Sequence, residues 1–174
     1  DRTRQDGFLQ KQAQLLSDTE KRISELGFET SEEGWTAEAY LYCVDAEVPG
    51  VPYRIPLSPT WVVSEKHRVC AVLREAADDG VAIDIVSDAS TTTWRAAKAG
   101  TTSTIRDSRI VDPLQAGRDW PLEAVRGLEG VRRWARNEIA PRDTDVLGER
   151  LYCIRWRTPE GERVYRAPTP FDLR

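Results

Sequence analysis

The chain of 174 residues is long enough to bury a hydrophobic core without disulfides or bound metal. Its net charge of −4 and its pI near 5.2 argue against a stand-alone DNA-binding protein, and no apolar run approaches the length of a membrane span. Three widely spaced cysteines argue against a disulfide scaffold and indicate a reducing, cytoplasmic environment. The sequence begins at Asp1 and contains no methionine, which suggests a piece cut from a longer polypeptide or a processed product, and we expect a single domain that is a fragment of a larger polypeptide.

Residues 1–27 are predicted to form a leading amphipathic helix, whose regular part spans 3–26. Apolar residues recur there at spacings of three and four positions, the period of an α-helix, and Gly27 supplies a C-terminal stop. The apolar positions are Leu9, Ala13, Leu16, Ile23 and Leu26. A single apolar stripe predicts that the helix docks on another surface, such as a part of the parent protein.

Strands dominate the region that follows. The predicted strands are 37–45, 52–57, 60–64, 68–75 and 81–87. Asp79-Gly80 lies between two segments of alternating polarity, which is a strong signal for a hairpin. A short helix is predicted over 91–99, with Ser90 or Asp88 as its N-cap.

The last part of the chain combines an ambiguous segment with a clear hairpin. Residues 118–140 carry a helical period, but Gly127 and Gly130 interrupt it, at a cost of about 1 kcal/mol each relative to alanine. Two segments of alternating polarity then flank a turn at Pro159-Glu160-Gly161. The two predicted strands of this C-terminal hairpin are 150–156 and 162–167.

These elements together predict an α+β fold in a single domain. Its expected parts are a leading helix (1–27), a ribbon-like antiparallel β region with a short helix (35–117), and an Arg-rich segment that ends in the C-terminal hairpin (118–174).

The turn after the first predicted strand has the outline of a zinc knuckle without its metal ligands. Cys43 lies in that strand, and a Pro-Gly turn over residues 48–52 stands where a zinc ribbon would carry a cysteine pair. A structural zinc stabilises a module that cannot bury enough core, and a larger apolar core makes the metal dispensable. We therefore predict a ribbon-like module that binds no metal.

Three stretches of the chain carry a family resemblance. They are AEAYLYCVDAE…YRIPLSPTWVVSEK (38–66), RGLEGVRRWARNEIAPRDTDVLGERLYCIRW (126–156) and YRAPTPFDL (165–173). Together they resemble the central, zinc-ribbon-like region of large adenine-specific DNA methyltransferases, in which such a segment is inserted in a Rossmann-like catalytic domain. Those relatives often carry cysteine pairs in two turns, whereas this sequence has Val-Pro-Gly-Val-Pro at the first place and Asp112-Pro113-Leu114 at the second.

The resemblance implies chemistry for the parent protein, not for this chain. It implies S-adenosylmethionine as methyl donor, adenine in DNA as acceptor, and a role in restriction-modification or defence against phage. Adenine methylation needs an Asn-Pro-Pro-Tyr type loop and a glycine-rich cofactor turn. Asn137 is the only asparagine, Glu138 and Ile139 follow it, and no glycine-rich turn is present. We therefore predict no catalytic residue and no cofactor within these residues.

Other side chains of chemical interest have simpler interpretations. Cys43, His67, Cys70 and Cys153 have the side-chain types of a Cys3His zinc site, but only His67 and Cys70 are close in sequence. We interpret the cysteines as core residues and His67 as an exposed residue of a hairpin turn. Five aspartates are interpreted as solvated turn or loop residues: Asp78, Asp79, Asp84, Asp143 and Asp145.

Arginines are the best candidates for contacts with nucleic acid. Residues 106–174 hold 14 arginines and no lysine, although a GC-rich genome also favours arginine. The predicted DNA contacts are Arg126, Arg132, Arg133, Trp134 and Arg136. The alternative is a solvated face with Trp134 in the core. A second, weaker patch, partly neutralised by Glu160 and Glu162, consists of Arg155, Arg157, Arg163 and Arg166.

Two functional hypotheses follow, and an independent small enzyme ranks behind both. The first is a non-catalytic insert of a DNA adenine methyltransferase, which helps to position DNA or braces the catalytic domain. The second is a protein-interaction module that uses the apolar face of the leading helix to link the methyltransferase to a helicase or other partner in a restriction or phage-defence system. The expected partners are thus DNA, the remainder of the polypeptide and such a defence partner, with no membrane.

Overall fold

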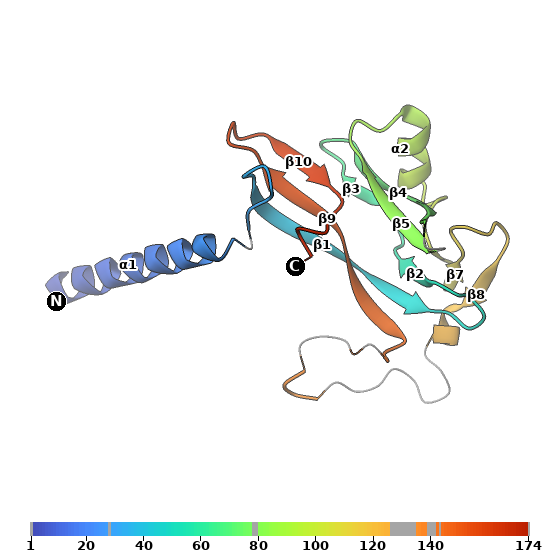
Figure 1. Ribbon diagram of the computed structural model, residues 1–174, viewed down its shortest axis with the longest axis horizontal. Coiled ribbons are helices and arrows are strands. Elements are labelled where there is room, and N and C mark those ends of the chain that lie inside the picture. The colour runs from blue at the N-terminus through green and yellow to red at the C-terminus, as the bar shows by residue number, and fades with distance from the viewer. Residues whose placement is uncertain are drawn as a thin grey trace.

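The structure, a computed structural model, describes residues 2–27, 29–77, 80–125, 135–138, 142 and 144–173, apart from the side chains of residues 2–6 and 24 (Figure 1). A long helix projects from a body built of three antiparallel sheets and a short helix. This arrangement confirms the predicted α+β class.

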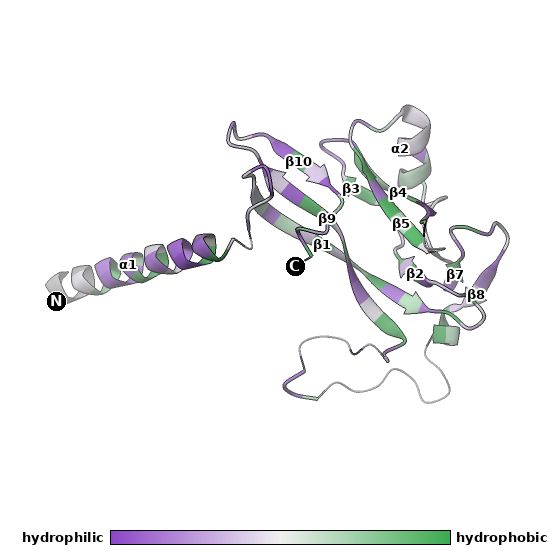
Figure 2. Ribbon diagram, in the orientation of Figure 1, coloured by the Kyte–Doolittle hydropathy of each residue, from purple (hydrophilic) through white to green (hydrophobic). Residues whose placement is uncertain are grey.

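Helix α1 (Arg2–Leu26) closely matches the predicted leading helix. Gly27 follows its last residue with a φ of +72°, the left-handed conformation that glycine adopts without strain. The ribbon of α1 extends away from the sheets, and hydrophilic and hydrophobic segments alternate along it (Figure 2).

The first sheet has the order β10-β9-β1-β2. Its strands are β1 (Thr36–Glu47), β2 (Arg54–Leu57), β9 (Leu147–Arg157) and β10 (Arg163–Arg166). β1 and β9 pair over nearly their whole length, from Thr36 opposite Arg157 to Ala46 opposite Leu147. The predicted C-terminal hairpin is confirmed as β9–β10, closed by a turn in which Gly161 has a φ of +86°.

The second sheet has the order β3-β4-β5, and α2 covers one of its faces. The elements are β3 (Val62–Ser64), β4 (Val69–Glu75), β5 (Val81–Val86) and α2 (Thr91–Lys98). Glu75 pairs with Val81, which confirms the predicted hairpin; Asp78 and Asp79 lie outside the described residues. Of the two predicted N-caps for α2, Ser90 is the cap, because its side chain accepts a hydrogen bond from the backbone N–H of Thr93.

The third sheet is small and precedes a single turn of 3₁₀ helix. It comprises β6 (Ile105–Arg106), β7 (Arg109–Val111) and β8 (Asp119–Pro121), followed by η1 (Leu122–Val125). The helical period from residue 118 therefore does not produce an α-helix at its start. Trp120 pairs with Ile110 in the sheet instead, and both pack, with Val125, in one apolar cluster. Residues 126–134 and 139–141 lie outside the described residues.

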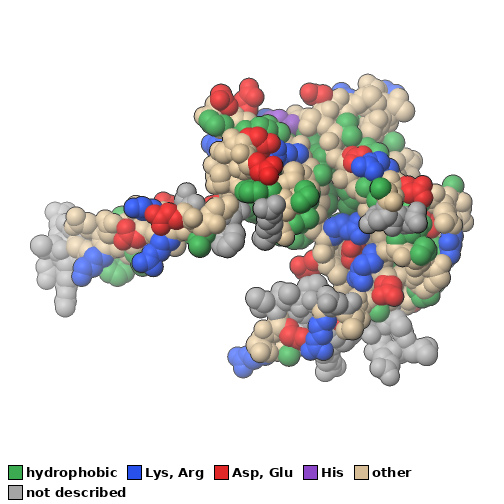
Figure 3. Space-filling model, viewed as in Figure 1, with side chains coloured by type: hydrophobic (Ala, Val, Ile, Leu, Met, Phe, Trp, Pro, Cys, Tyr) green, Lys and Arg blue, Asp and Glu red, His purple; other side chains and the backbone are tan. Residues whose placement is uncertain are grey.

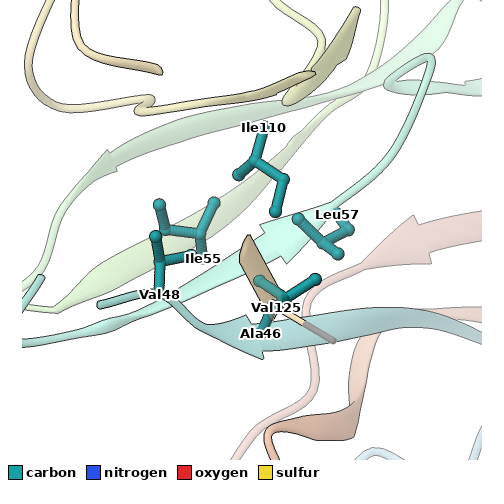
Figure 4. Packing of buried hydrophobic residues seen from close by; sticks show 6 residues of the cluster. All are labelled: Ala46, Val48, Ile55, Leu57, Ile110 and Val125. Carbon is teal, nitrogen blue, oxygen red and sulfur yellow. The ribbon is translucent and has the colours of Figure 1, made fainter. Parts of the chain in front are cut away.

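Apolar packing joins the three sheets. Figure 4 shows a cluster in which side chains of β1, the turn after it, β2, β7 and η1 meet; it consists of Ala46, Val48, Ile55, Leu57, Ile110 and Val125. Between the first two sheets, Trp61 packs edge-on against Tyr152, with ring centroids 5.8 Å apart. Val48, in the turn after β1, thus packs in a buried apolar cluster.

Candidate functional site

The predicted DNA contacts fall largely outside the described residues. Arg126, Arg132, Arg133 and Trp134 are among the residues that the structure does not describe. Arg136 is described and lies exposed in a turn. The structure therefore places one of these five candidates on the surface and leaves the grouping of all five as a prediction.

The arginines of the C-terminal hairpin converge on a single carboxylate, that of Glu38 in β1. Nε of Arg157 donates to Oε1 at 2.6 Å, and Nε of Arg163 donates to Oε2 at 2.8 Å. Nε of Arg155 lies 3.1 Å from Oε2. The side chain of Glu38 is only 13% exposed among these cations, and hydrogen bonds from Arg157 and then Arg163 lower its pKa. Three guanidinium groups around one carboxylate leave an excess of positive charge.

The fourth hairpin arginine, Arg166, has different partners. Its two terminal nitrogens donate to the two carboxylate oxygens of Glu33, at 2.7 and 2.9 Å. Its guanidinium lies over Trp35 and Trp156, with centroid distances of 4.7 and 5.2 Å. The bidentate pair and a hydrogen bond from Ser31 lower the pKa of Glu33 to about 2.

These contacts identify the carboxylates that face the hairpin arginines. The sequence suggested Glu160 and Glu162, whereas the ion pairs run to Glu38 and Glu33. Figure 3 shows acidic and basic side chains next to each other across the visible face of the body. In the described region the hairpin arginines therefore pair with carboxylates of β1 and of the loop before it. Arg157 and Arg163 are still about half exposed.

A buried ion-pair cluster joins β1, β2 and β9. The carboxylate of Asp45 accepts from Nε of Arg54 at 2.8 Å and from Nε of Arg150 at 3.1 Å. Nη1 of Arg150 also donates to the carbonyl of Val81 at 2.8 Å, which links the first sheet to the second. Separating the members of this cluster would leave a buried charged group without its partner, which is costly. The cluster therefore holds β1, β2 and β9 together, and the bond from Arg150 to Val81 holds them to the second sheet.

The three cysteines are buried, as predicted, and lie in three different apolar clusters. Burial raises the pKa of the Cys43 thiol to about 11 and that of Cys153 to about 12, and it also raises the pKa of Cys70. A thiol with a raised pKa has little thiolate character at neutral pH, so these cysteines are poorly activated as nucleophiles. Within the described ranges, no three His, Cys, Asp or Glu side chains form a group that could hold a metal ion.

His67 lies in the predicted turn, but it is half-buried and not exposed. Its ring is tilted against that of Tyr165, with centroids 5.8 Å apart. The sequence interpretation was wrong on exposure because β10, which carries Tyr165, comes from the far end of the chain. Asp84 is not merely solvated either, since both its oxygens accept hydrogen bonds from Arg74.

A cavity of about 580 Å³ lies between β4, α2 and the loop after β7. Asp112 lines it and is almost completely buried; its Oδ1 accepts hydrogen bonds from the Tyr53 hydroxyl at 2.8 Å and from the backbone N–H of Leu114 at 2.9 Å. Burial, together with this hydrogen bond, raises the pKa of Tyr53 to about 12. Asp112 thus shapes the loop at the cavity. Through the Tyr53 hydroxyl it also ties that loop to the residue that precedes β2.

The apolar stripe of α1 is uncovered in the described structure. Every described side chain of α1 from residue 7 to residue 26 is exposed. The large apolar side chains among them are 38% to 68% exposed, and they are Phe8, Leu9, Leu15, Leu16, Ile23 and Leu26. No helix in the described ranges is long and apolar enough to cross a membrane.

Comparison of the chain with family models, curated proteins and solved structures found no match.

Proposed function

We propose that this chain is a non-catalytic module of a larger DNA adenine methyltransferase. The apolar face of α1 docks on the remainder of that enzyme, and the module thereby braces its catalytic domain. The observation that carries the proposal is that every described side chain of α1 from residue 7 to residue 26 is exposed. The methyltransferase identity of the parent rests on the sequence resemblance, and S-adenosylmethionine is expected in that parent.

The stripe on α1 has the geometry of a docking face. Leu9, Leu16 and Ile23 follow one another at intervals of seven residues, and Phe8 and Leu15 repeat the same interval one position earlier. At 100° per residue these side chains share one face of the helix. Burying six large apolar side chains stabilises a complex by on the order of 10 kcal/mol before the costs of association.

The stripe is too wide and too interrupted for a simple two-stranded coiled coil. Gln12 and Thr19 occupy the positions where a second apolar column would continue the heptad pattern of Leu9 and Leu16. A wide stripe instead fits a groove or a helical surface on a folded partner. This supports docking onto the remainder of the same polypeptide, with a separate defence-system partner as the alternative occupant.

The need for a partner also follows from helix energetics. A helix without tertiary packing is marginally stable in water, even when its sequence favours helix formation. Within α1, Lys21 and Glu25 form an exposed i,i+4 ion pair at 3.9 Å, a contact of a few tenths of a kcal/mol. Such a contact does not replace a packed face.

A role in DNA positioning is the second candidate. The excess positive charge around Glu38 supports it, because Arg157 and Arg163 remain about half exposed next to the carboxylate that they share. Phosphate contacts by such arginines predict an affinity for DNA that falls steeply with salt. A titration of the chain with duplex DNA at two salt concentrations tests this role.

The bracing role is tested on the full-length polypeptide. Leu9→Glu with Leu16→Glu places two charges on the apolar face, and Gln10→Glu with Gln14→Glu places the same charges on the opposite face. We expect the first pair to lower the melting temperature and the DNA methylation activity of the full polypeptide, and the second pair to leave both unchanged. Equal behaviour of the two pairs would rule out docking through this face.

A further inference from the structure

One face of the β9–β10 hairpin carries three arginines side by side. Arg155 and Arg157 are two residues apart in β9, so their side chains leave the same face of the sheet. Arg163 in β10 is paired directly with Arg157 and shares that face. The carboxylate of Glu38 in β1 contacts all three guanidinium groups. The strand register thus brings the arginines together, and the shared carboxylate gathers their guanidinium groups at one place.

The charge of this cluster is not balanced by its own members. Hydrogen bonds from the arginines lower the pKa of Glu38, so its carboxylate is ionised at neutral pH. Three guanidinium charges against one carboxylate charge leave a net charge of +2. Within the part of the chain that the structure describes, neither Glu160 nor Glu162 forms an ion pair with these arginines. The cluster therefore favours an anion from outside the chain.

The three guanidinium groups also keep donors available for such an anion. Among the described residues, no acceptor takes a hydrogen bond from Nη1 of Arg157 or from the terminal nitrogens of Arg155 and Arg163. The side chains of Arg155, Arg157 and Arg163 are 34%, 54% and 43% exposed, so the cluster is open to solvent. Glu38 thus occupies part of each donor set and leaves the rest free.

A phosphate monoester matches both the charge and the donors of the cluster. It carries close to two negative charges at pH 7 and offers three terminal oxygens as acceptors. A phosphodiester carries only one negative charge, and arginine forks bind phosphate oxygens with paired hydrogen bonds. We propose that Arg155, Arg157 and Arg163 together bind a phosphate monoester, and that this group is the terminal phosphate of a DNA strand.

The choice of DNA as the source rests on the proposed function, in which DNA positioning is the second candidate. The arginines lie on a sheet face and are one third to one half exposed, so a group at the end of a long strand can reach them. A phosphate within the strand is esterified on both sides and lacks the second charge and the third terminal oxygen. The recognition of a monoester follows from the cluster alone and does not depend on its source.

The decisive experiment compares two ligands that differ by one methyl group and one charge. The chain is titrated by calorimetry at about pH 7.5 with methyl phosphate, a dianion, and with dimethyl phosphate, a monoanion. We expect methyl phosphate to bind with a dissociation constant in the millimolar range or below. Dimethyl phosphate should bind about tenfold more weakly, because it lacks one charge and one acceptor oxygen. Absent binding of methyl phosphate, or equal binding of the two ligands, would overturn the proposal.

Variants locate the site. Arg157→Gln with Arg163→Gln removes two of the three cations, and we expect it to weaken the binding of methyl phosphate about tenfold. The third arginine remains to pair with the carboxylate. Arg74→Gln with Arg109→Gln removes the same charge from β4 and β7 and should leave this binding unchanged. Equal weakening by both pairs, or none by the first, would contradict the proposal. The comparison of the two ligands uses the parent chain, so it decides the proposal even where a variant is unstable.

A separate arm identifies the source of the group. The chain is titrated with one DNA duplex that carries either a phosphate or a hydroxyl at its 5′ ends. We expect the phosphorylated duplex to bind several-fold more tightly, and Arg157→Gln with Arg163→Gln to remove that difference. Equal binding of the two duplexes would overturn the assignment to a DNA end. A failure here is distinct from a failure of α1 docking, because the variants of the α1 stripe leave these arginines intact.

Discussion

Asp45 and Gly148 face each other across β1 and β9 at a distance that leaves no room for a side chain. A Cβ atom on Gly148 would lie 2.7 Å from Oδ1 of Asp45 and 2.9 Å from Nη2 of Arg54. Glycine at this position therefore allows the buried ion-pair cluster to form between the strands. Gly148 thus makes room for the cluster whose Arg150 links the first sheet to the second.

The first prediction concerns this glycine. Gly148→Ala must displace the carboxylate of Asp45 or the guanidinium of Arg54, and we expect a loss of about 1–3 kcal/mol in the free energy of unfolding. Urea denaturation measures it. Gly7→Ala is the control, because nothing lies within 4 Å of its added Cβ, and stability should be unchanged or slightly raised. Equal stability of Gly148→Ala and the parent chain would show that the cluster is not rigid.

The second prediction follows from the ion pair between Glu33 and Arg166. Because the pKa of Glu33 is lowered from 4.5 to about 2 in the folded chain, its contribution to stability is fully present above pH 4.5 and is lost as the pH falls toward 2. Glu33→Gln should therefore be less stable than the parent chain at pH 7, with a difference that shrinks between pH 4.5 and pH 2. Thermal unfolding across this range measures the difference. A gap that stays constant down to pH 2 would contradict the lowered pKa.

The third prediction concerns the buried thiols. At pH 8, Cys43 and Cys153 should react with a thiol reagent far more slowly in the native chain than in urea, because their pKa values of about 11 and 12 keep them protonated and burial shields them. The purified chain should also contain no stoichiometric zinc and should melt at the same temperature with and without chelator. Rapid native labelling, or one zinc per chain by elemental analysis, would refute the assignment of the cysteines to the core.

The fourth prediction concerns DNA contacts outside the described residues. Arg132→Glu with Arg133→Glu should weaken DNA binding by the full-length polypeptide and reduce the dependence of log K on log salt by about two. Arg74→Glu with Arg109→Glu changes the charge equally, at arginines that pair with Asp84 and Asp119. If both double variants weaken binding alike, net charge and not a specific patch accounts for the effect.

Local patterns of the sequence predicted the local structure well. The α1 stripe, the β4–β5 hairpin, the Ser90 cap and the β9–β10 hairpin all arise from residues close in sequence, whose turn and capping preferences act locally. Their bounds were predicted to within a few residues.

Long-range contacts were not predictable in the same way. Glu38 meets Arg157 only because β1 pairs with β9, and the register of that pair depends on packing between sheets. The strand at Trp120 was missed because its pairing with Ile110 outweighs a local helical period. A cavity of about 300 Å³ at the end of α1 is lined by residues from four separate segments of the chain, so no local pattern could predict it.

The most direct test of the central claim is amide hydrogen exchange in α1, measured in this chain alone and in the full-length polypeptide. Because docking covers the apolar face, amides between Leu9 and Ile23 should exchange at least tenfold more slowly in the full-length polypeptide, and Leu9→Glu with Leu16→Glu should abolish that protection. Equally fast exchange of α1 in both proteins would contradict the bracing role.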